Sequence, residues 1–133
     1  MSQEVTARAP FANVIGLGLI GASLALALAE QGYEVAGEDR DTEVSATALE
    51  RKIISRIGIV PDAAITFVCT PVTTVVEEVV RALSNTSGIV TDVGSVKAHV
   101  ATAVHDPRFI PGHPMAGSEL DGIDGADATM FDL

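Results

Sequence analysis

A glycine-rich turn offers the most specific chemistry in the sequence. Gly16, Gly18 and Gly21 follow the pattern G-x-G-x-x-G, after an apolar stretch at 13–16 and before a helix-forming run at 22–31. Glycines at these positions permit a tight turn, close approach of a phosphate to the backbone, and close packing of the helix on the strand. The helix amino terminus offers unpaired N–H groups and a positive dipole end. The pattern therefore predicts a pyrophosphate site.

Asp39 makes the glycine pattern more specific. It lies eighteen residues after Gly21, at the end of an expected strand at 34–38. A carboxylate there can accept hydrogen bonds from the adenine ribose of a dinucleotide. It favours NAD over NADP because it repels a 2′-phosphate, and the neighbouring Arg40 weakens that preference without reversing it. NAD is the predicted cofactor; the alternative is a structural turn with an ordinary surface aspartate.

A second strand end is expected to reach the same edge of the sheet. Thr70 and Pro71 follow an apolar stretch at 64–69, and ligands of open parallel sheets bind at the carboxyl ends of the strands. A plain strand-to-helix turn is the alternative. Cys69 is expected to be a small buried apolar residue rather than a reactive thiol. The expected cofactor contacts are Gly16, Gly18, Leu19, Ile20, Gly21, Asp39, Arg40, Thr70 and Pro71.

Two later segments carry groups that could act on a substrate. Ser95, within 91–97, can either cap a helix or point into the cleft. His113 lies on a loop flanked by prolines and glycines, where an imidazole can accept a hydroxyl proton as hydride leaves the same carbon. A surface or capping histidine is an equally open interpretation. His99 and His105 are weaker candidates because they fall within, or near the end of, an expected helix.

The elements that position these residues alternate along the chain. Short apolar stretches are typical of buried strands, and the intervening runs of helix formers predict right-handed crossovers. The valine-rich run 72–83 is ambiguous by propensity, but its context favours a helix. The sequence therefore predicts an α/β fold, a Rossmann-type doubly wound parallel sheet. The expected strands are 13–16, 34–38, 64–69, 88–92 and about 109–110, and the expected helices are 22–31, 42–52, 72–83 and 97–104.

Composition narrows the class of protein. The 133 residues suit one domain, and 47% hydrophobic with 4% aromatic residues predicts an aliphatic core. A net charge of −10 makes nucleic acid an unexpected partner. The apolar stretch 17–29 is shorter than the roughly 20 residues of a membrane span. No secretory signal, disulfide or metal-site spacing is recognised, so we expect a cytoplasmic protein with a flexible tail at 1–10 and an NAD-binding domain at 11–133.

Four segments together resemble the prephenate and arogenate dehydrogenases in order and spacing: 16–21, 70–72, 92–97 and 113–119. The resemblance runs from about Phe11 to the end of the chain. It implies NAD-dependent oxidative decarboxylation of prephenate to 4-hydroxyphenylpyruvate in tyrosine biosynthesis. It further implies that His113 is the catalytic base, that Ser95 orients this histidine and the substrate, and that Glu119 lies near the substrate entrance.

The resemblance also predicts parts beyond this chain. Family members continue with further strands, which makes the nucleotide domain incomplete at its carboxyl end, and then with a helical domain that forms a homodimer and supplies a substrate-binding arginine. A homodimer is therefore expected only for a full-length form. Arg108 is the nearest cation here and a weak candidate for that role. A non-catalytic NAD-binding fragment is the alternative; a dehydrogenase of β-hydroxy acids or cyclic imines is disfavoured by the last two segments.

Overall fold

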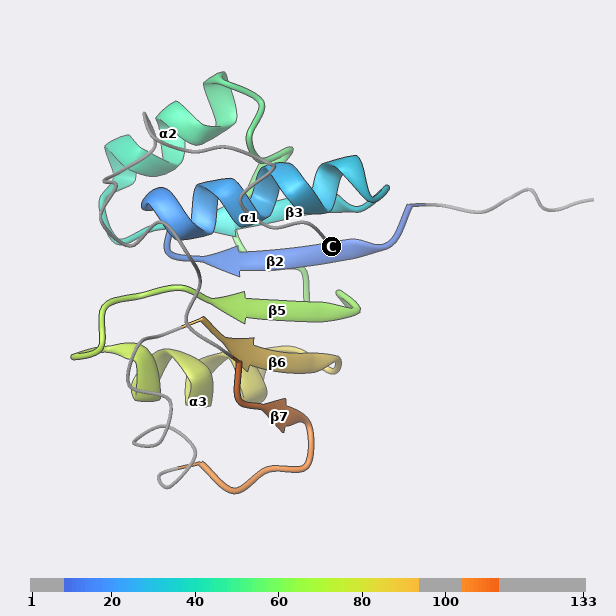
Figure 1. Cartoon of the computed structure of the whole chain (residues 1–133), viewed down its shortest axis with the longest axis vertical. Coiled ribbons are helices and arrows are strands. Elements are labelled where there is room, and N and C mark those ends of the chain that lie inside the picture. Colours follow the sequence, from blue (N-terminus) through green and yellow to red (C-terminus); the bar gives the residue numbers. More distant parts are fainter. Residues whose placement is uncertain (1–8, 94–103, 113–133) are drawn as a thin grey trace, which may run out of the picture.

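A parallel sheet forms the centre of the molecule. The computed structural model describes residues 9–93 and 104–112, and within them six strands pair in the order β4-β3-β2-β5-β6-β7 (Figure 1). This order, with the first strand in the middle and the chain filling one half before the other, is that of the Rossmann doubly wound sheet. The predicted fold class is therefore confirmed. The strands are β2 (Phe11–Ile15), β3 (Glu34–Glu38), β4 (Arg56–Ile57), β5 (Ile65–Val68), β6 (Ile89–Asp92) and β7 (Phe109–Ile110).

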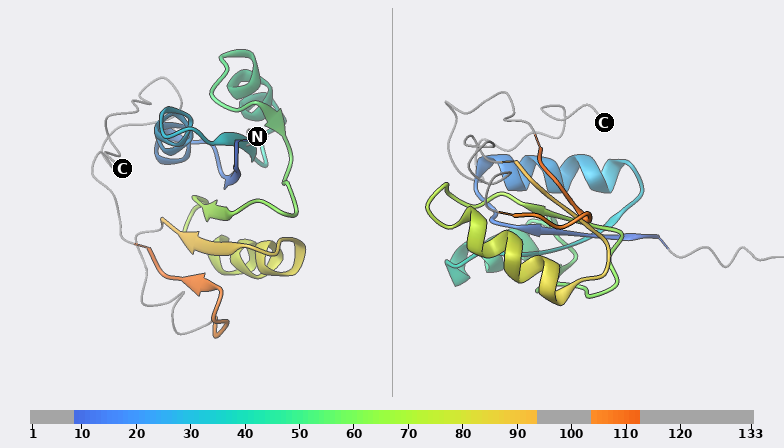
Figure 2. Two further views of the ribbon diagram at one scale, coloured as in Figure 1. Left: turned by 90° about the vertical axis from the view of Figure 1, so that its right-hand side faces the viewer. Right: turned by 90° about the horizontal axis from the view of Figure 1, so that it is seen from below.

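Helices cover both faces of the sheet. α1 (Leu19–Glu30) packs on β2 and β3, whereas α3 (Val75–Asn85) packs on β5 and β6 from the opposite face (Figure 2). α2 (Thr42–Glu50) lies beside β3 and β4. Asp41 caps α2 by accepting a hydrogen bond from the Glu43 N–H at 3.0 Å. Because each helix joins two parallel strands, the carboxyl ends of all the strands meet at one edge.

The core is aliphatic, as the composition predicts. One apolar cluster lies between α1 and β2, around Val14, Leu17 and Leu24. A second lies between α3 and the strands β5 and β6, around Val68 and Val79. Burial of this apolar area is the main favourable term for folding.

A buried asparagine organises the crossover between the two halves of the sheet. The Asn13 side chain is fully buried; its amide donates to the Val60 carbonyl at 3.0 Å and to the Thr66 hydroxyl at 2.9 Å, and its oxygen accepts from the Val60 N–H at 2.8 Å. These bonds join β2, β5 and the segment that connects β4 to β5. No helix is assigned in this connection, from 58 to 64, so Asn13 fixes a crossover made of irregular chain.

Most predicted elements are present with shifted ends. α1 begins at Leu19, three residues earlier than predicted, and α3 covers 75–85 instead of 72–83 because residues 71–74 form a turn closed by the Thr74 N–H and the Pro71 carbonyl. β4 was missed. The helix predicted at 97–104 lies outside the described residues except for Val104, and so does the predicted tail except for its last two residues. In the described part, no helix is long and apolar enough to cross a membrane.

Candidate functional site

The three glycines of the G-x-G-x-x-G pattern, which spans the turn after β2 and the start of α1, differ in their surroundings. Gly16 has φ +96°, and a Cβ there would lie 2.7 Å from the Cys69 carbonyl oxygen. A Cβ on Gly21 would lie 1.8 Å from the Gly16 carbonyl oxygen, which no side chain tolerates. A Cβ on Gly18 would meet no atom of the described residues within 4 Å. The fold therefore explains Gly16 and Gly21, whereas Gly18 leaves open space that suits a bound group.

The helix that follows, α1, begins without a capping side chain. Gly18 is the N-cap of α1; no side chain caps it, and no acidic residue lies in the first turn. The first turn therefore has N–H groups that no capping side chain satisfies, and it contains no acidic residue of its own to offset the helix dipole. Together with the open space at Gly18, this arrangement suits a phosphate.

Asp39 is directed back toward the glycine turn. One carboxylate oxygen accepts from the Leu17 N–H at 2.8 Å and the other from the Asp41 N–H at 2.9 Å. The Asp39 N–H donates to the Ser45 hydroxyl at 2.9 Å. Each oxygen retains a lone pair after one bond, so the carboxylate can still accept from a ligand hydroxyl. The predicted acid is thus held in a defined orientation beside the predicted phosphate site.

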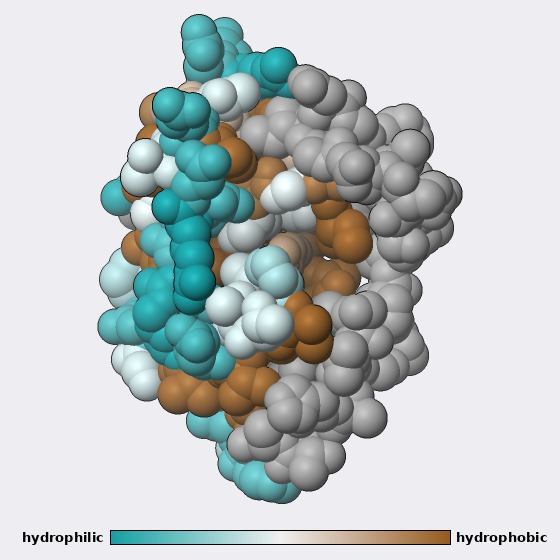
Figure 3. All heavy atoms as spheres, turned by 90° about the vertical axis from the view of Figure 1, so that its left-hand side faces the viewer, coloured by the Kyte–Doolittle hydropathy of each residue, from teal (hydrophilic) through white to brown (hydrophobic). Residues whose placement is uncertain are grey.

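A cavity of about 400 Å³ opens at this edge of the sheet. Its walls include Gly16, Asp39, Arg40 and Thr70, four of the predicted cofactor contacts, together with Glu78 and Arg81 from α3. The Thr70 hydroxyl oxygen is buried and has no hydrogen-bond partner among the described residues. Figure 3 faces this side of the molecule, where hydrophilic residues form a band beside a hollow. A cavity with a free hydroxyl and an oriented carboxylate suits a polar ligand.

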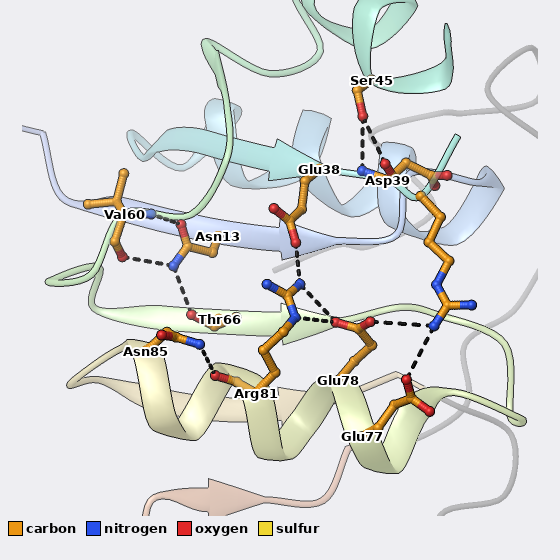
Figure 4. A network of polar contacts seen from close by, with 11 residues as sticks. Asn13, Glu38, Asp39, Ser45, Val60, Thr66, Glu77, Glu78, Arg81 and Asn85 are labelled. Atoms are coloured by element: carbon orange, nitrogen blue, oxygen red, sulfur yellow. Dashed lines mark hydrogen bonds and ion pairs between the residues drawn. The ribbon is translucent and has the colours of Figure 1, made fainter. Parts of the chain in front are cut away.

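A network of charged side chains closes one side of the cavity (Figure 4). Arg81 donates to Glu38 of β3 and, at 2.9 Å, to Glu78. Burial lowers the pKa of Arg81, but its hydrogen bonds with Glu38 and Glu78 raise it by more, so the guanidinium remains charged. Arg40 lies 3.3 Å from Glu77 and 3.9 Å from Glu78. The network therefore links the carboxyl end of β3, through Glu38 and Arg40, to α3.

Comparison with known sequences identifies the family. The family profile described as "Prephenate dehydrogenase, nucleotide-binding domain" matches residues 24–133. The chain belongs to this family. Its sequence is 34% identical to prephenate dehydrogenase of Lactococcus lactis over 134 residues, and 36% identical to that of Bacillus subtilis over 132 residues. These alignments cover 90% and 88% of this chain but only 38% and 36% of the two relatives, so the chain spans less than half of their length.

Solved structures agree with the family assignment. Arogenate dehydrogenase of Synechocystis is 38% identical, with a TM-score of 0.77 over 91% of this chain and 46% of that one. Prephenate dehydrogenase of A. aeolicus, solved with hydroxyphenyl propionate and NAD+, has a TM-score of 0.80 over 95% of this chain and 49% of that one; at 24% identity it supports the fold. The family resemblance drawn from the four segments is therefore confirmed.

Cys69 lies directly under the glycine turn and is unsuited to nucleophilic chemistry. Desolvation raises the pKa of its thiol, and the charge of Asp92 raises it further. The side chain packs against the apolar cluster around α1. This environment agrees with the prediction of a small apolar residue rather than a reactive thiol.

The residues predicted to act on the substrate, Ser95, His113 and Glu119, lie outside the described residues. The structure does show where the His113 segment starts. The Gly112 N–H donates to an Asp92 carboxylate oxygen at 3.1 Å, and a Cβ on Gly112 would lie 1.9 Å from the Asp92 carbonyl oxygen. The chain therefore leaves the sheet against the carboxyl end of β6, on the edge where the glycine turn lies.

The Arg108 side chain makes its hydrogen bonds at the opposite edge of the sheet, where the strands begin. Its guanidinium donates to the carbonyl oxygens of Leu83 at 2.5 Å, Thr86 at 2.9 Å and Gly88 at 2.8 Å. It therefore caps the carboxyl end of α3 and holds the start of β6. This placement argues against even the weak candidacy of Arg108 as a cation for substrate carboxylates.

Sequence reasoning missed part of the cavity wall. Glu38, Glu78 and Arg81 line the cavity, Glu77 pairs with Arg40, and Asp92 holds the Gly112 amide, yet none was singled out. The spacing of Glu78 and Arg81 by three residues on a helix was a signal for an ion pair. The sequence contained no signal that this pair would face β3. Within the described residues, no group of three or more histidine, cysteine, aspartate or glutamate side chains could hold a metal ion.

Proposed function

We propose that this chain holds NAD at the carboxyl edge of its sheet and forms part of an enzyme that oxidatively decarboxylates prephenate to 4-hydroxyphenylpyruvate in tyrosine biosynthesis. The observation that carries the proposal is the open space at Gly18, beside an uncapped helix terminus and within a chain of the prephenate dehydrogenase family. The fold leaves that glycine unexplained, and a pyrophosphate explains it.

The residues of this edge suit the pyrophosphate and the adenosine half of NAD. The turn that starts at Gly16 would hold the pyrophosphate through the backbone N–H groups of residues 18–21, which include Leu19 and Ile20. Asp39 would accept from the adenosine ribose hydroxyls, and Arg40, Thr70 and Pro71 would contact the adenosine half. The free Thr70 hydroxyl supports this assignment, because a buried hydroxyl without a partner costs free energy that a ligand contact recovers.

NAD supplies the hydride acceptor, and the residues outside the described part would supply the rest. His113 would take the proton of the substrate hydroxyl as hydride leaves the same carbon, which creates a carbonyl group. Ser95 would orient His113 and the substrate, and Glu119 would lie near the entrance. Loss of the ring carboxylate as CO2 then makes the ring aromatic. The position of Gly112 against β6 supports this assignment, because His113 follows it directly.

Two measurements test the proposal. We expect calorimetric titration to detect NAD binding to the chain, and absorbance to detect NADH formation with prephenate that His113→Asn abolishes. Arogenate is assayed in parallel, because the Synechocystis relative at 38% identity is an arogenate dehydrogenase. Absence of NAD binding would overturn the whole proposal.

A second candidate function is an NAD-binding unit without activity of its own. It is favoured by the length of the chain, which spans 38% and 36% of the two curated relatives. NAD binding without turnover would support it. Turnover that depends on His113 would exclude it.

A further inference from the structure

Arg40 is the exposed cation beside the carboxylate that would receive the adenosine ribose. Among the described residues that line the cavity, the cations are Arg40 and Arg81. Arg81 is already bonded to Glu38 and Glu78. In a nucleotide site of this kind, an arginine next to the acidic residue is the group that can accept the 2′-phosphate of NADP. Whether Arg40 is free therefore bears directly on cofactor choice.

In the structure, the Arg40 side chain is paired with glutamates of α3. One guanidinium nitrogen lies 3.3 Å from the Glu77 carboxylate and 3.9 Å from that of Glu78. Glu77 is 68% exposed, but Glu78 is only 11% exposed and is fixed by Arg81 at 2.8 Å. Glu78 is thus held in place by Arg81, whereas Arg40, itself 67% exposed, forms a solvent-exposed ion pair with Glu77 at the mouth of the cavity.

The charge around the cavity is unfavourable for a second phosphate. Glu38, Asp39 and Glu78 line it, and Glu77 lies beside it; among the described lining residues, two arginines offset these four carboxylates. A 2′-phosphate would meet the Asp39 carboxylate directly and would find both arginines paired. A ribose hydroxyl carries no charge and meets no such penalty.

We propose that Glu77 and Glu78 of α3 are specificity-determining residues that favour NAD over NADP by pairing with Arg40 and so withholding its charge from a 2′-phosphate. This inference rests on the proposed function only in requiring that a dinucleotide binds at this edge. Asp39 repels the 2′-phosphate itself, whereas the two glutamates withdraw the cation that would compensate for Asp39. The preference for NAD therefore comes both from Asp39, at the end of β3, and from the two glutamates of α3, which packs on the other half of the sheet.

Glu77→Gln tests the inference, because Glu77 is exposed and Arg40 is the partner the structure gives it. Dissociation constants of NAD and NADP are measured by calorimetry for the chain and for this variant, in the native background and with Asp39→Asn, which retains an acceptor oxygen. We expect the NADP constant to fall roughly two- to five-fold, the worth of an exposed ion pair. The NAD constant should stay nearly unchanged.

Two further variants make the result specific. Glu50→Gln removes the same charge from the exposed last residue of α2, away from the cavity, and should leave the NADP constant unchanged. Arg40→Gln added to Glu77→Gln should cancel the gain, because the freed cation is then absent. An unchanged NADP constant in both backgrounds, an equal gain in Glu50→Gln, or a gain that survives Arg40→Gln would overturn the inference. A native chain that binds neither dinucleotide would instead overturn the proposed function.

Discussion

Gly18 and Gly21 lie three residues apart, yet an added methyl group should weaken NAD binding at Gly18 and destabilise the fold at Gly21. A Cβ on Gly18 meets no atom of the described residues within 4 Å, and φ of −72° is open to any residue. We expect Gly18→Ala to change the free energy of unfolding by less than about 1 kcal/mol, the range for an N-cap substitution. The same methyl should weaken NAD binding about tenfold or more, because it fills the space assigned to the pyrophosphate.

Gly21→Ala is the matched control for that experiment. Its Cβ would lie 1.8 Å from the Gly16 carbonyl oxygen, and backbone cannot move aside without displacing the turn. The cost should exceed the roughly 3 kcal/mol of ordinary overpacking, measured by denaturant unfolding. If Gly18→Ala also unfolded the chain, or left NAD binding intact, the phosphate site would not lie at Gly18.

Cys69 should make the chain less stable at alkaline pH. Burial, aided by Asp92, raises the pKa of the folded thiol above its ordinary value of 9.0. The thiol therefore contributes stability that is complete below about pH 9 and is lost as pH rises, because only the unfolded chain then releases the proton. The loss can reach about 1.4 kcal/mol per pH unit.

Cys69→Ala isolates that contribution from other titrating groups. Its free energy of unfolding should fall less steeply than that of the native chain above pH 9, so the difference between the two narrows. A difference that stays constant with pH would show that the folded thiol ionises normally. Slow reaction of the folded chain with a thiol reagent, and fast reaction once it is unfolded, would agree with the raised pKa.

At the scale of elements, Arg108 joins α3, β6 and β7 through three backbone carbonyls. Its removal leaves those acceptors without their charged donor. We expect Arg108→Ala to lower the free energy of unfolding by about 2–3 kcal/mol and to leave the NAD dissociation constant unchanged. Arg108→Lys should restore only part of the loss, since an ammonium lacks the planar fork. Weaker NAD binding with unchanged stability would contradict the capping role.

The elements that the sequence revealed are those whose pattern is local. The strand at 34–38 was predicted with its observed bounds, because its short apolar run at 35–37 is flanked by Glu34 and Glu38. β4 was missed, because it consists of two exposed residues whose strand geometry comes only from pairing with β3. The helix over α3 was predicted despite its valines, because its position between β5 and β6 outweighs propensity.

The same distinction applies to the candidate site. Gly16, Asp39 and Thr70 were predictable, because each follows a recognisable strand and the carboxyl ends of parallel strands share an edge. Glu77 and Glu78 were not, because their contact with Arg40 joins residues from the two halves of the sheet that lie far apart in the sequence. Arg108 shows the converse, since proximity in sequence to the His113 segment suggested a role in the site and its side chain extends to the other edge.

At the scale of the molecule, the sheet has two ends, and each has a cavity. The one of about 400 Å³ lies at the carboxyl edge, where Gly16 and Asp39 meet. The other, of about 370 Å³, lies between the carboxyl ends of α1 and α2 and includes Tyr33 and Lys52. Size does not distinguish the two cavities. Helix direction does, since the amino terminus of α1 follows Gly16, which lines the first cavity, whereas Ala29 near the carboxyl end of α1 lines the second.

Hydrogen exchange of the whole chain should therefore show NAD protection at one edge only. We expect saturating NAD to slow amide exchange in residues 16–21 and 39–42, which lie at the proposed site, and to leave 31–34 and 52–55 unchanged. Binding should also raise the melting temperature in proportion to the logarithm of NAD concentration. Protection confined to the Tyr33 end would mean that the dipole and the glycine turn do not select the site, and protection spread evenly over the sheet would mean that NAD stabilises the fold without a local contact there.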